Sequence, residues 1–269
     1  MKNENCLNSW RNTTVLLAID VGNTNIKYAL FEGEVIRSSF KVRTDSSKTS
    51  DELGISLANL LKARGHSIDA IRAIIISSVV PDIMHSLNNA ILKYFNTEPM
   101  IVKPGIKTGI KLVKTNPSEV GSDRLVNGVA ALELYGGPVI VADYGTATKF
   151  DLFGDDRVFE SAVTCPGIML SARALWEGTA KLPEVEIANP GTIMCKDTLT
   201  SLQAGILYGK VGEAEYIIKK MKEEYGREDI PVIATGGISK IIYQETDCID
   251  YWDPNLTMYG LRLIYEKNR

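Results

Sequence analysis

The sequence has few histidines, no paired cysteines and no excess of positive charge. With only His66 and His85, a His-based zinc site or a Ser–His–Asp triad is poorly supplied. The four cysteines are Cys6, Cys165, Cys195 and Cys248. Because they form no Cys-x-x-Cys pair and show no metal-ligand spacing, they predict small buried thiols in a reducing compartment rather than disulfides.

Long apolar runs and strong net charge are also missing. No stretch approaches the ~18 apolar residues of a membrane span, and residues 1–13 lack the apolar core of a signal peptide. A formal net charge of −3 gives no support to nucleic-acid binding, which needs a basic patch or stripe. We therefore expect a cytoplasmic protein that binds neither a membrane nor nucleic acid.

What is present is enough apolar sequence for a large core. The chain has 269 residues, of which 45% are hydrophobic and 23% charged, as in ordinary globular proteins. We predict an N-terminal extension, 1–14, for which disorder is one interpretation, followed by two domains, 15–135 and 136–269.

Each half of the chain predicts the element order β-β-β-α-β-α-β-α. In the first half we expect strands near 15–20, 25–31, 34–42, 73–80 and 99–103, and helices near 51–64, 82–95 and 122–134. In the second half we expect strands near 139–143, 147–153, 157–163, 231–234 and 248–252, and helices near 168–178, 199–225, 238–245 and 256–267. Ser50 is the expected N-cap of the first helix, and the long helix could break at Gly209 or Gly212. Short turns imply antiparallel pairs and helical crossovers imply parallel ones, so the predicted fold class is α/β, with two mixed sheets and a cleft between them.

The most informative feature is a repeated segment. The apolar run that ends in Asp20-Val21-Gly22-Asn23-Thr24 is echoed by the run that ends in Asp143-Tyr144-Gly145-Thr146. Each copy predicts a buried strand ending at an acid, a tight glycine turn and a hairpin return. Turn N–H groups bind anions, and a nearby carboxylate holds a hydrated cation. Two facing copies therefore indicate that the protein binds the phosphate chain of a metal–nucleotide complex from both sides, which points to phosphoryl transfer. Either copy alone is equally explained as an ordinary hairpin turn.

Two further segments carry candidate chemistry. Gly121-Ser122-Asp123-Arg124 opens a predicted helix, where an adjacent acid and base suit a general base and a cationic clamp. Helix capping by Asp123 is the alternative. Thr235-Gly236-Gly237 follows an apolar strand and opens a helix, where glycines let a base or ribose approach the backbone closely. A tight strand–helix turn is the alternative there.

Taken in order, these segments resemble the type III pantothenate kinases of the acetate and sugar kinase/Hsp70/actin superfamily. The resemblance spans residues 15–268 and also includes Asn116–Val120, Pro166–Ile168, Lys181–Pro183, Asp197–Thr198, Gln203–Ile206 and Asp253–Thr257. It implies two duplicated ribonuclease H-like domains, each a mixed five-stranded sheet with flanking helices, and an active site in the interdomain cleft. The implied reaction is ATP-dependent phosphorylation of the primary hydroxyl of pantothenate to 4′-phosphopantothenate, the first step of coenzyme A biosynthesis.

The resemblance also implies roles for particular residues. Those implied to bind ATP are Asp20, Val21, Gly22, Asn23, Thr24, Asn25, Ile26, Lys27 and Thr146. Those implied to bind pantothenate are Lys114, Gly121, Ser122, Asp123, Arg124 and Thr198, with Asp123 as the catalytic base. Asp143 is implied to bind a monovalent cation, K⁺ or NH₄⁺, so that potassium would activate over sodium. Asp20 is implied to hold Mg²⁺, directly or through water, and the substrate pocket would be completed in a homodimer.

Three departures from the family pattern are visible. Lys114 stands where the family usually has a substrate-contacting Tyr, Ser161–Thr164 replaces a strand that is commonly Gly-Gly-x-Ile, and Cys195 replaces a frequent Gly. Because of Lys114, a second hypothesis stays open: a related small-molecule kinase that acts on another hydroxylated acid or sugar. A third hypothesis is a non-catalytic nucleotide-binding regulatory protein. The presence of Asp20, Asp123, Arg124 and Asp143 argues against it, because a protein without turnover need not keep all four.

Overall fold

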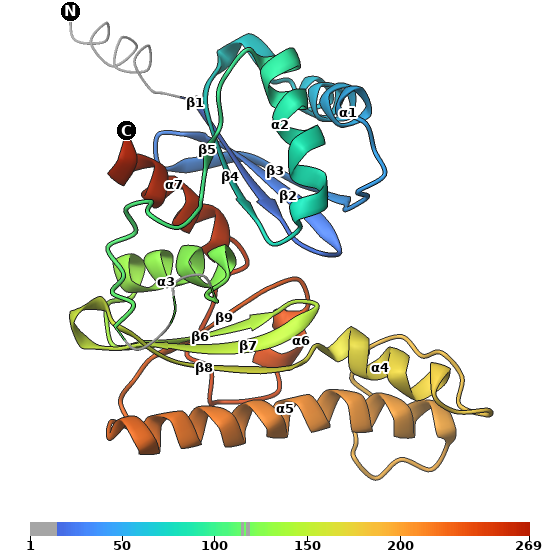
Figure 1. Ribbon diagram of the computed structural model, residues 1–269. Coiled ribbons are helices and arrows are strands. Elements are labelled where there is room, and N and C mark those ends of the chain that lie inside the picture. Colours follow the sequence, from blue (N-terminus) through green and yellow to red (C-terminus); the bar gives the residue numbers. More distant parts are fainter. Residues whose placement is uncertain (1–14, 114–115, 117–118) are drawn as a thin grey trace, which may run out of the picture. The chain divides into compact units, whose positions relative to one another are not determined.

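A computed structural model describes residues 15–113, 116 and 119–269, which fall into two units (Figure 1). Unit 1 contains the described residues up to Thr108 together with Val120–Val126 and Thr257–Arg269. Unit 2 contains the described residues of Gly109–Glu119 together with Asn127–Leu256. The predicted extension, 1–14, and Lys114 lie outside the described residues. The division of the chain at residues 135 and 136 stays a prediction.

Unit 1 is built on a mixed five-stranded sheet. Its strands are β1 (Val15–Val21), β2 (Asn25–Glu32), β3 (Val35–Arg43), β4 (Ile71–Ser78) and β5 (Met100–Ile101), in the order β3-β2-β1-β4-β5. The first three strands pair antiparallel, and β4 and β5 are added in parallel, as the short turns and helical crossovers predict. The predicted fold class is confirmed for this unit.

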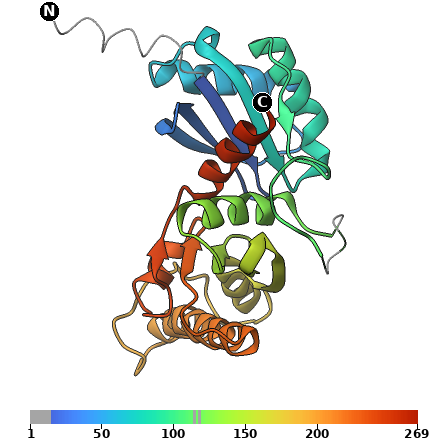
Figure 2. The ribbon, with the colours of Figure 1, turned by 90° about the vertical axis from the view of Figure 1, so that its left-hand side faces the viewer.

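Helices cover both faces of the unit 1 sheet (Figures 1 and 2). They are α1 (Ser50–Ala63), α2 (Pro81–Phe95), the first turn of α3 (Ser122–Leu134) and most of α7 (Leu256–Asn268), with a 3₁₀ turn at Ile68–Ala70. Leu17 and Ile19 share one core with buried residues of α1 and α2. Phe31 meets Tyr259 of α7 on the other face, with ring centroids 6.0 Å apart. Since side chains alternate along a strand, Asp20 points to the face opposite Ile19, which is the α7 face.

The N-terminus of α1 differs from the prediction. The cap is Thr49 rather than Ser50. The Thr49 hydroxyl accepts the Glu52 N–H at 3.3 Å, and Glu52 Oε2 accepts the Thr49 N–H at 2.8 Å. This capping box needs the acid three residues after the cap, a spacing that only Thr49 satisfies.

Unit 2 repeats the architecture of unit 1. Its strands are β6 (Val139–Tyr144), β7 (Ala147–Phe153), β8 (Phe159–Pro166), β9 (Val232–Thr235) and β10 (Tyr251–Trp252), in the order β10-β9-β6-β7-β8. Its other elements are the remainder of α3, α4 (Ile168–Glu177), α5 (Thr198–Tyr225), α6 (Ser239–Tyr243) and a 3₁₀ turn at Asp155–Arg157. Both predicted sheets are therefore mixed and five-stranded.

Helix α5 is continuous, so the predicted break at Gly209 or Gly212 is wrong. Each glycine costs only about 1 kcal/mol in a helix, and α5 buries a long stripe that includes Leu207, Val211 and Ile218. With this stripe, α5 packs against the sheet face that carries Ile140 and Ala142, and α4 and α6 cover the same face. By alternation, Asp143 lies on the opposite face of the sheet.

Candidate active site

The first predicted phosphate turn is braced by the neighbouring strand of unit 1. The Gly22 N–H donates to the Asn25 carbonyl at 3.1 Å, which closes the turn between β1 and β2. Thr44, directly after β3, donates its hydroxyl to the Gly22 carbonyl at 2.6 Å and its N–H to the Thr24 carbonyl at 3.0 Å. Asn23 and Thr24 are exposed at the tip. A fixed, exposed turn of this kind suits the binding of an anion by backbone N–H groups.

Asp20 has two polar neighbours on its sheet face. Lys27 lies directly opposite on β2, and Ser77 lies opposite on β4. Directly opposed residues project from the same face, so acid, lysine and hydroxyl form one row across three strands. Sequence reasoning missed Ser77, whose only sequence signal is a serine directly after the apolar run Ala73–Ile76.

Ser77 fastens the start of α3 to this face of unit 1. The Ser122 hydroxyl donates to the Ser78 carbonyl at 3.1 Å and lies 3.0 Å from the Ser77 hydroxyl. Because a hydroxyl has one hydrogen, Ser77 is the donor in that second bond. Ser77 is fully buried. The bond therefore places the first turn of α3, with Asp123 and Arg124, beside the polar row that starts at Asp20.

The conformation of Asp123 depends on Gly121. Asp123 Oδ1 accepts the Arg124 N–H at 2.9 Å, so the carboxylate folds back over its own helical turn. A Cβ on Gly121 would lie 2.5 Å from Asp123 Oδ1. The glycine is needed because any side chain at this position would displace the carboxylate. Asp123 thus accepts the N–H of the next residue, in a half-buried position that suits a base. The capping alternative for Asp123 stays open.

The second predicted phosphate turn lies against two other predicted segments of unit 2. The Gly145 N–H donates to the Ala147 carbonyl, and the Gly167 N–H donates to the Thr146 carbonyl, both at 3.1 Å. Gly236, at φ 101°, lies so close to the turn that a Cβ would be 2.5 Å from the Tyr144 carbonyl oxygen. A Cβ on Gly167 would likewise meet the Thr146 carbonyl oxygen, so Gly167 and Gly236 are both required by close approach of neighbouring backbone. The approach of a base or ribose to Gly236 stays a prediction. Gly145 and Thr146 remain exposed.

The polar row of unit 1 is repeated in unit 2. Asp143 is opposed by Lys149 on β7 and by Thr235 on β9. Lys149 Nζ lies 3.1 Å from Asp143 Oδ2. Thr235 is fully buried, and its hydroxyl has no hydrogen-bond partner within the described part of the chain. Sequence reasoning missed Lys149, although a lysine soon after a short hairpin turn is a usable signal.

Tyr144, next to Asp143, is a core residue and not an acid or base of the site. Its side chain points to the opposite face of the sheet and meets Phe150 edge-on, with ring centroids 6.3 Å apart. Burial raises the pKa of the Tyr144 hydroxyl far above its usual range, so the phenol stays protonated.

Thr198 is placed apart from Asp143. It is the exposed first residue of α5, after the N-cap Asp197, whose carboxylate accepts the Thr200 N–H at 3.0 Å. The hydrogen bonds from Thr200 hold the pKa of Asp197 below its usual range. Helix α5 covers the sheet face opposite Asp143, so a single chain does not bring Thr198 to that acid.

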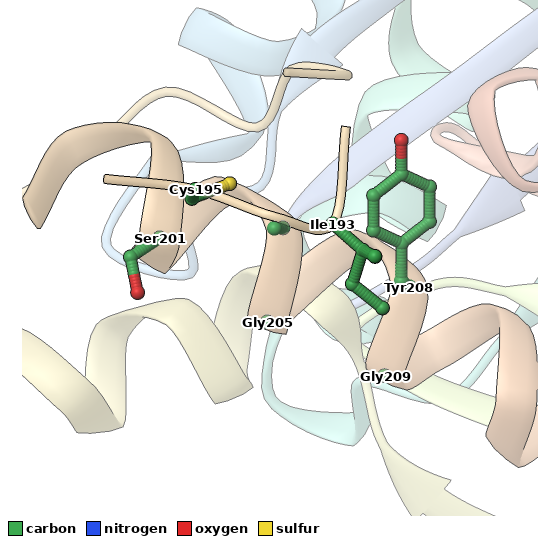
Figure 3. Close-up of a pocket in the computed structure, with 7 residues that line it drawn as sticks. Ile193, Cys195, Ser201, Gly205, Tyr208 and Gly209 are labelled. Atoms are coloured by element: carbon green, nitrogen blue, oxygen red, sulfur yellow. The ribbon is translucent and has the colours of Figure 1, made fainter. Parts of the chain in front are cut away.

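A pocket lies beside the first turns of α5. Its volume is 450 Å³, and Figure 3 shows Ile193 and Cys195 from the preceding loop and Ser201, Gly205, Tyr208 and Gly209 from α5. None of the predicted site residues lines it. Large apolar side chains are exposed on α4, on this loop and at the start of α5: Met169, Leu170, Leu175, Ile193, Met194 and Leu199. Such a cluster is typical of an interaction surface.

The described residues were predicted to lack a His-based metal site, a membrane span and disulfides. Within residues 15–113, 116 and 119–269, no three His, Cys, Asp or Glu side chains are grouped to hold a metal ion. No helix in this part of the chain is long and apolar enough to cross a membrane. Cys165, Cys195 and Cys248 are free thiols, as predicted, but each is partly exposed rather than buried; Cys6 lies outside the described residues.

Comparison with known proteins agrees with the fold and the motifs. The family model for type III pantothenate kinase matches residues 16–220. A type III pantothenate kinase from Agathobacter rectalis is 52% identical over 253 residues, which cover 94% of this chain and 97% of that protein.

Solved structures with low sequence identity support the fold alone. One, from Campylobacter jejuni, is assigned to the Baf family of transcriptional activators: TM-score 0.59, 16% identity, 94% of this chain and 98% of that one covered. Another, from Sinorhizobium meliloti, is assigned as a 2-dehydro-3-deoxygalactonokinase: TM-score 0.58, 13% identity, 93% and 96% covered.

The family match, on a fold of two mixed five-stranded sheets, defines the class of protein: the chain is a kinase. Within that class, the chain belongs to the type III pantothenate kinase family.

Proposed function

We propose that this protein transfers the γ-phosphoryl group of ATP to the primary hydroxyl of pantothenate, the first step of coenzyme A biosynthesis. Family membership supports the reaction. The observation that carries the assignment of residues is the Ser77–Ser122 bond, because it joins Asp123 and Arg124 to the Asp20 face. A cytoplasmic location stays a prediction.

The proposed roles follow from the chemistry of phosphoryl transfer. The transition state is loose, so in-line positioning and neutralisation of charge matter more than covalent help. The exposed tip of the first turn, at Asn23 and Thr24, and the turn at Thr146 would contact the phosphates through backbone N–H groups. Arg124 would neutralise charge on the transferred group. Asp123 would accept the proton of the substrate hydroxyl late in the reaction, when that hydroxyl becomes acidic.

Asp20 is the residue that would hold Mg²⁺. The ion keeps several waters and is usually bound by one or two carboxylates plus substrate phosphates, so a single half-buried acid beside the turn fits it. When bound, Mg²⁺ neutralises the charge of the β- and γ-phosphates. For Asp143 the resemblance implies a monovalent cation.

We also propose that the protein is a homodimer in which Thr198 contacts the substrate bound by the other protomer. Thr198 is exposed and lies on a different face of its unit from Asp143. It is flanked by the exposed apolar side chains of Met194 and Leu199, which a partner protomer would cover. This arrangement supports a pocket completed in the dimer.

The first test is ADP release with Mg-ATP, with and without pantothenate. Pantothenate-dependent turnover would support the proposal. ATP binding without turnover on pantothenate would favour the second candidate, a related kinase for another hydroxylated acid or sugar. Replacing Lys114 by Tyr would then be the first variant to examine, because that position departs from the family pattern.

Gly121→Ala is expected to lower kcat strongly while leaving the fold intact. The added methyl group meets only the end of the Asp123 side chain, which can swing away at little cost to stability. The displaced carboxylate no longer meets the substrate hydroxyl, and a misplacement of about 1 Å costs on the order of 100-fold in rate. Steady-state kinetics and a thermal melt would separate the two effects. A kcat equal to that of the wild type would contradict the role given to Gly121.

A further inference from the structure

In unit 2, the place that the resemblance gives to a monovalent cation already contains a positive charge. Lys149 Nζ lies 3.1 Å from Asp143 Oδ2. The two side chains are only 15% and 16% exposed, whereas those of the surface pair Arg173–Glu177 are 61% and 53% exposed. Because shielded charges are screened far less by water and salt, the attraction between Asp143 and Lys149 is less screened than that of the surface pair.

The contact between Asp143 and Lys149 is set by the fold. The two residues are directly opposed across β6 and β7, which are joined by the two-residue turn Gly145-Thr146. A two-residue hairpin turn fixes the register of its strands. Burial of Ile140 and Phe150 on the opposite face of the sheet fixes which way the pair points. Lys149 is therefore a built-in neighbour of the acid and not a mobile surface lysine.

The residues around Asp143 do not fit a potassium ion while Lys149 carries its charge. Potassium is held by several oxygen ligands. On this face the carboxylate of Asp143 and the buried hydroxyl of Thr235, directly opposite on β9, are such oxygens. An ion bound to them would lie within a few ångströms of the Lys149 ammonium, and the two like charges would repel at a poorly solvated position.

We propose that the ammonium of Lys149 takes the place of the monovalent cation at Asp143, so that this protein needs no added potassium or ammonium. The part of this inference that concerns turnover rests on the proposed kinase function. Lys149 balances the charge of Asp143 and holds the acid beside the turn that carries Thr146. It is a positioning residue, since it acts through Asp143 and the turn.

The test compares the wild type with Lys149→Met, which keeps the length of the side chain and removes its charge. Turnover is measured with Mg-ATP and pantothenate in choline chloride, and then with KCl, NH₄Cl or NaCl added. The wild type is expected to be active in choline and unchanged by potassium. Lys149→Met is expected to lose about tenfold or more in choline, on the scale of one lost charged hydrogen bond. Potassium or ammonium should restore that activity by occupying the oxygens of Asp143 and Thr235.

Two control variants and a second readout complete the test. Lys149→Arg keeps the charge and should stay independent of potassium. Lys219→Met removes an exposed lysine on α5, whose side chain is 71% exposed, and should behave as the wild type. The Tm of each protein is also titrated with KCl against choline chloride. Only Lys149→Met should show a saturable rise in Tm with potassium.

Saturable stimulation of the wild type by potassium, in turnover or in Tm, would overturn the inference. So would a loss of activity in Lys149→Met that neither potassium nor ammonium restores. If the wild type phosphorylates no pantothenate in any salt, the proposed function fails. The Tm titration then still decides whether Lys149 occupies the cation position.

Discussion

Asp123→Asn is expected to abolish most phosphorylation of pantothenate while leaving the fold intact. The amide oxygen of Asn can still accept the Arg124 N–H that Asp123 Oδ1 accepts at 2.9 Å, so the first turn of α3 keeps its hydrogen bond. The amide cannot take up the proton of the substrate hydroxyl. Loss of a general base costs about 10²- to 10⁴-fold in kcat. Steady-state kinetics, with ATP binding and a thermal melt measured on the same preparation, would check this result.

The control for Asp123→Asn is Asp82→Asn, an equal change of charge at an exposed position in the first turn of α2. It should leave kcat unchanged, because a surface acid at a helix start contributes only about 0.3–1 kcal/mol to stability. A kcat of Asp123→Asn close to that of the wild type would show that Asp123 is a helix-capping residue and not the base.

Gly260→Ala is expected to produce the largest loss of stability among single methyl additions in unit 1. Gly260 lies on α7 against the first turns of α3, where a Cβ would be 2.0 Å from the Val126 carbonyl oxygen. Backbone cannot swing away as a side chain can, so α7 would have to shift from its buried contacts. Overpacking of this kind costs about 1–3 kcal/mol, which lowers Tm by roughly 2–4 °C per kcal/mol in a chain of this size. Differential scanning calorimetry would measure the shift.

Gly212→Ala is the matched control for Gly260→Ala. Gly212 lies on an exposed part of α5 with nothing within 4 Å of an added Cβ. Alanine there should raise stability by about 0.5–1 kcal/mol, because glycine costs more backbone entropy in a helix. The packing role of Gly260 would be refuted by a Tm for Gly260→Ala at or above that of the wild type.

Much of the fold could be predicted from the sequence because local patterns encode it. Apolar runs that end at Asp20 and Asp143 gave two buried strands, and the glycines after them gave two hairpin turns. Helix α3 begins and ends at the predicted residues, Ser122 and Leu134. The last strand was predicted too long, at 248–252. Strand β10 contains only Tyr251 and Trp252, since it pairs at the edge of the sheet with two residues of β9.

The candidate site could be predicted only in part. The sequence supplied the acids and the glycines, because residue type and spacing along the chain are enough to recognise them. It did not supply the pairing of Asp143 with Lys149. The turn after β6 is one residue shorter than the turn after β1, so Lys149 does not align with Lys27 when the two copies are superposed by sequence. Both lysines nevertheless face their acids once the strands pair.

On its own, the sequence determined the order of elements, the two hairpin turns after Asp20 and Asp143, and the family to which the chain belongs. Tertiary structure alone decided that Ser77 fastens the start of α3, that Gly121 makes room for the Asp123 carboxylate and that Lys149 meets Asp143. The physical reason is that turns and helix starts depend on neighbours a few residues away. Contacts across strands and between helices instead depend on register and docking, which are set by packing among residues distant in the chain.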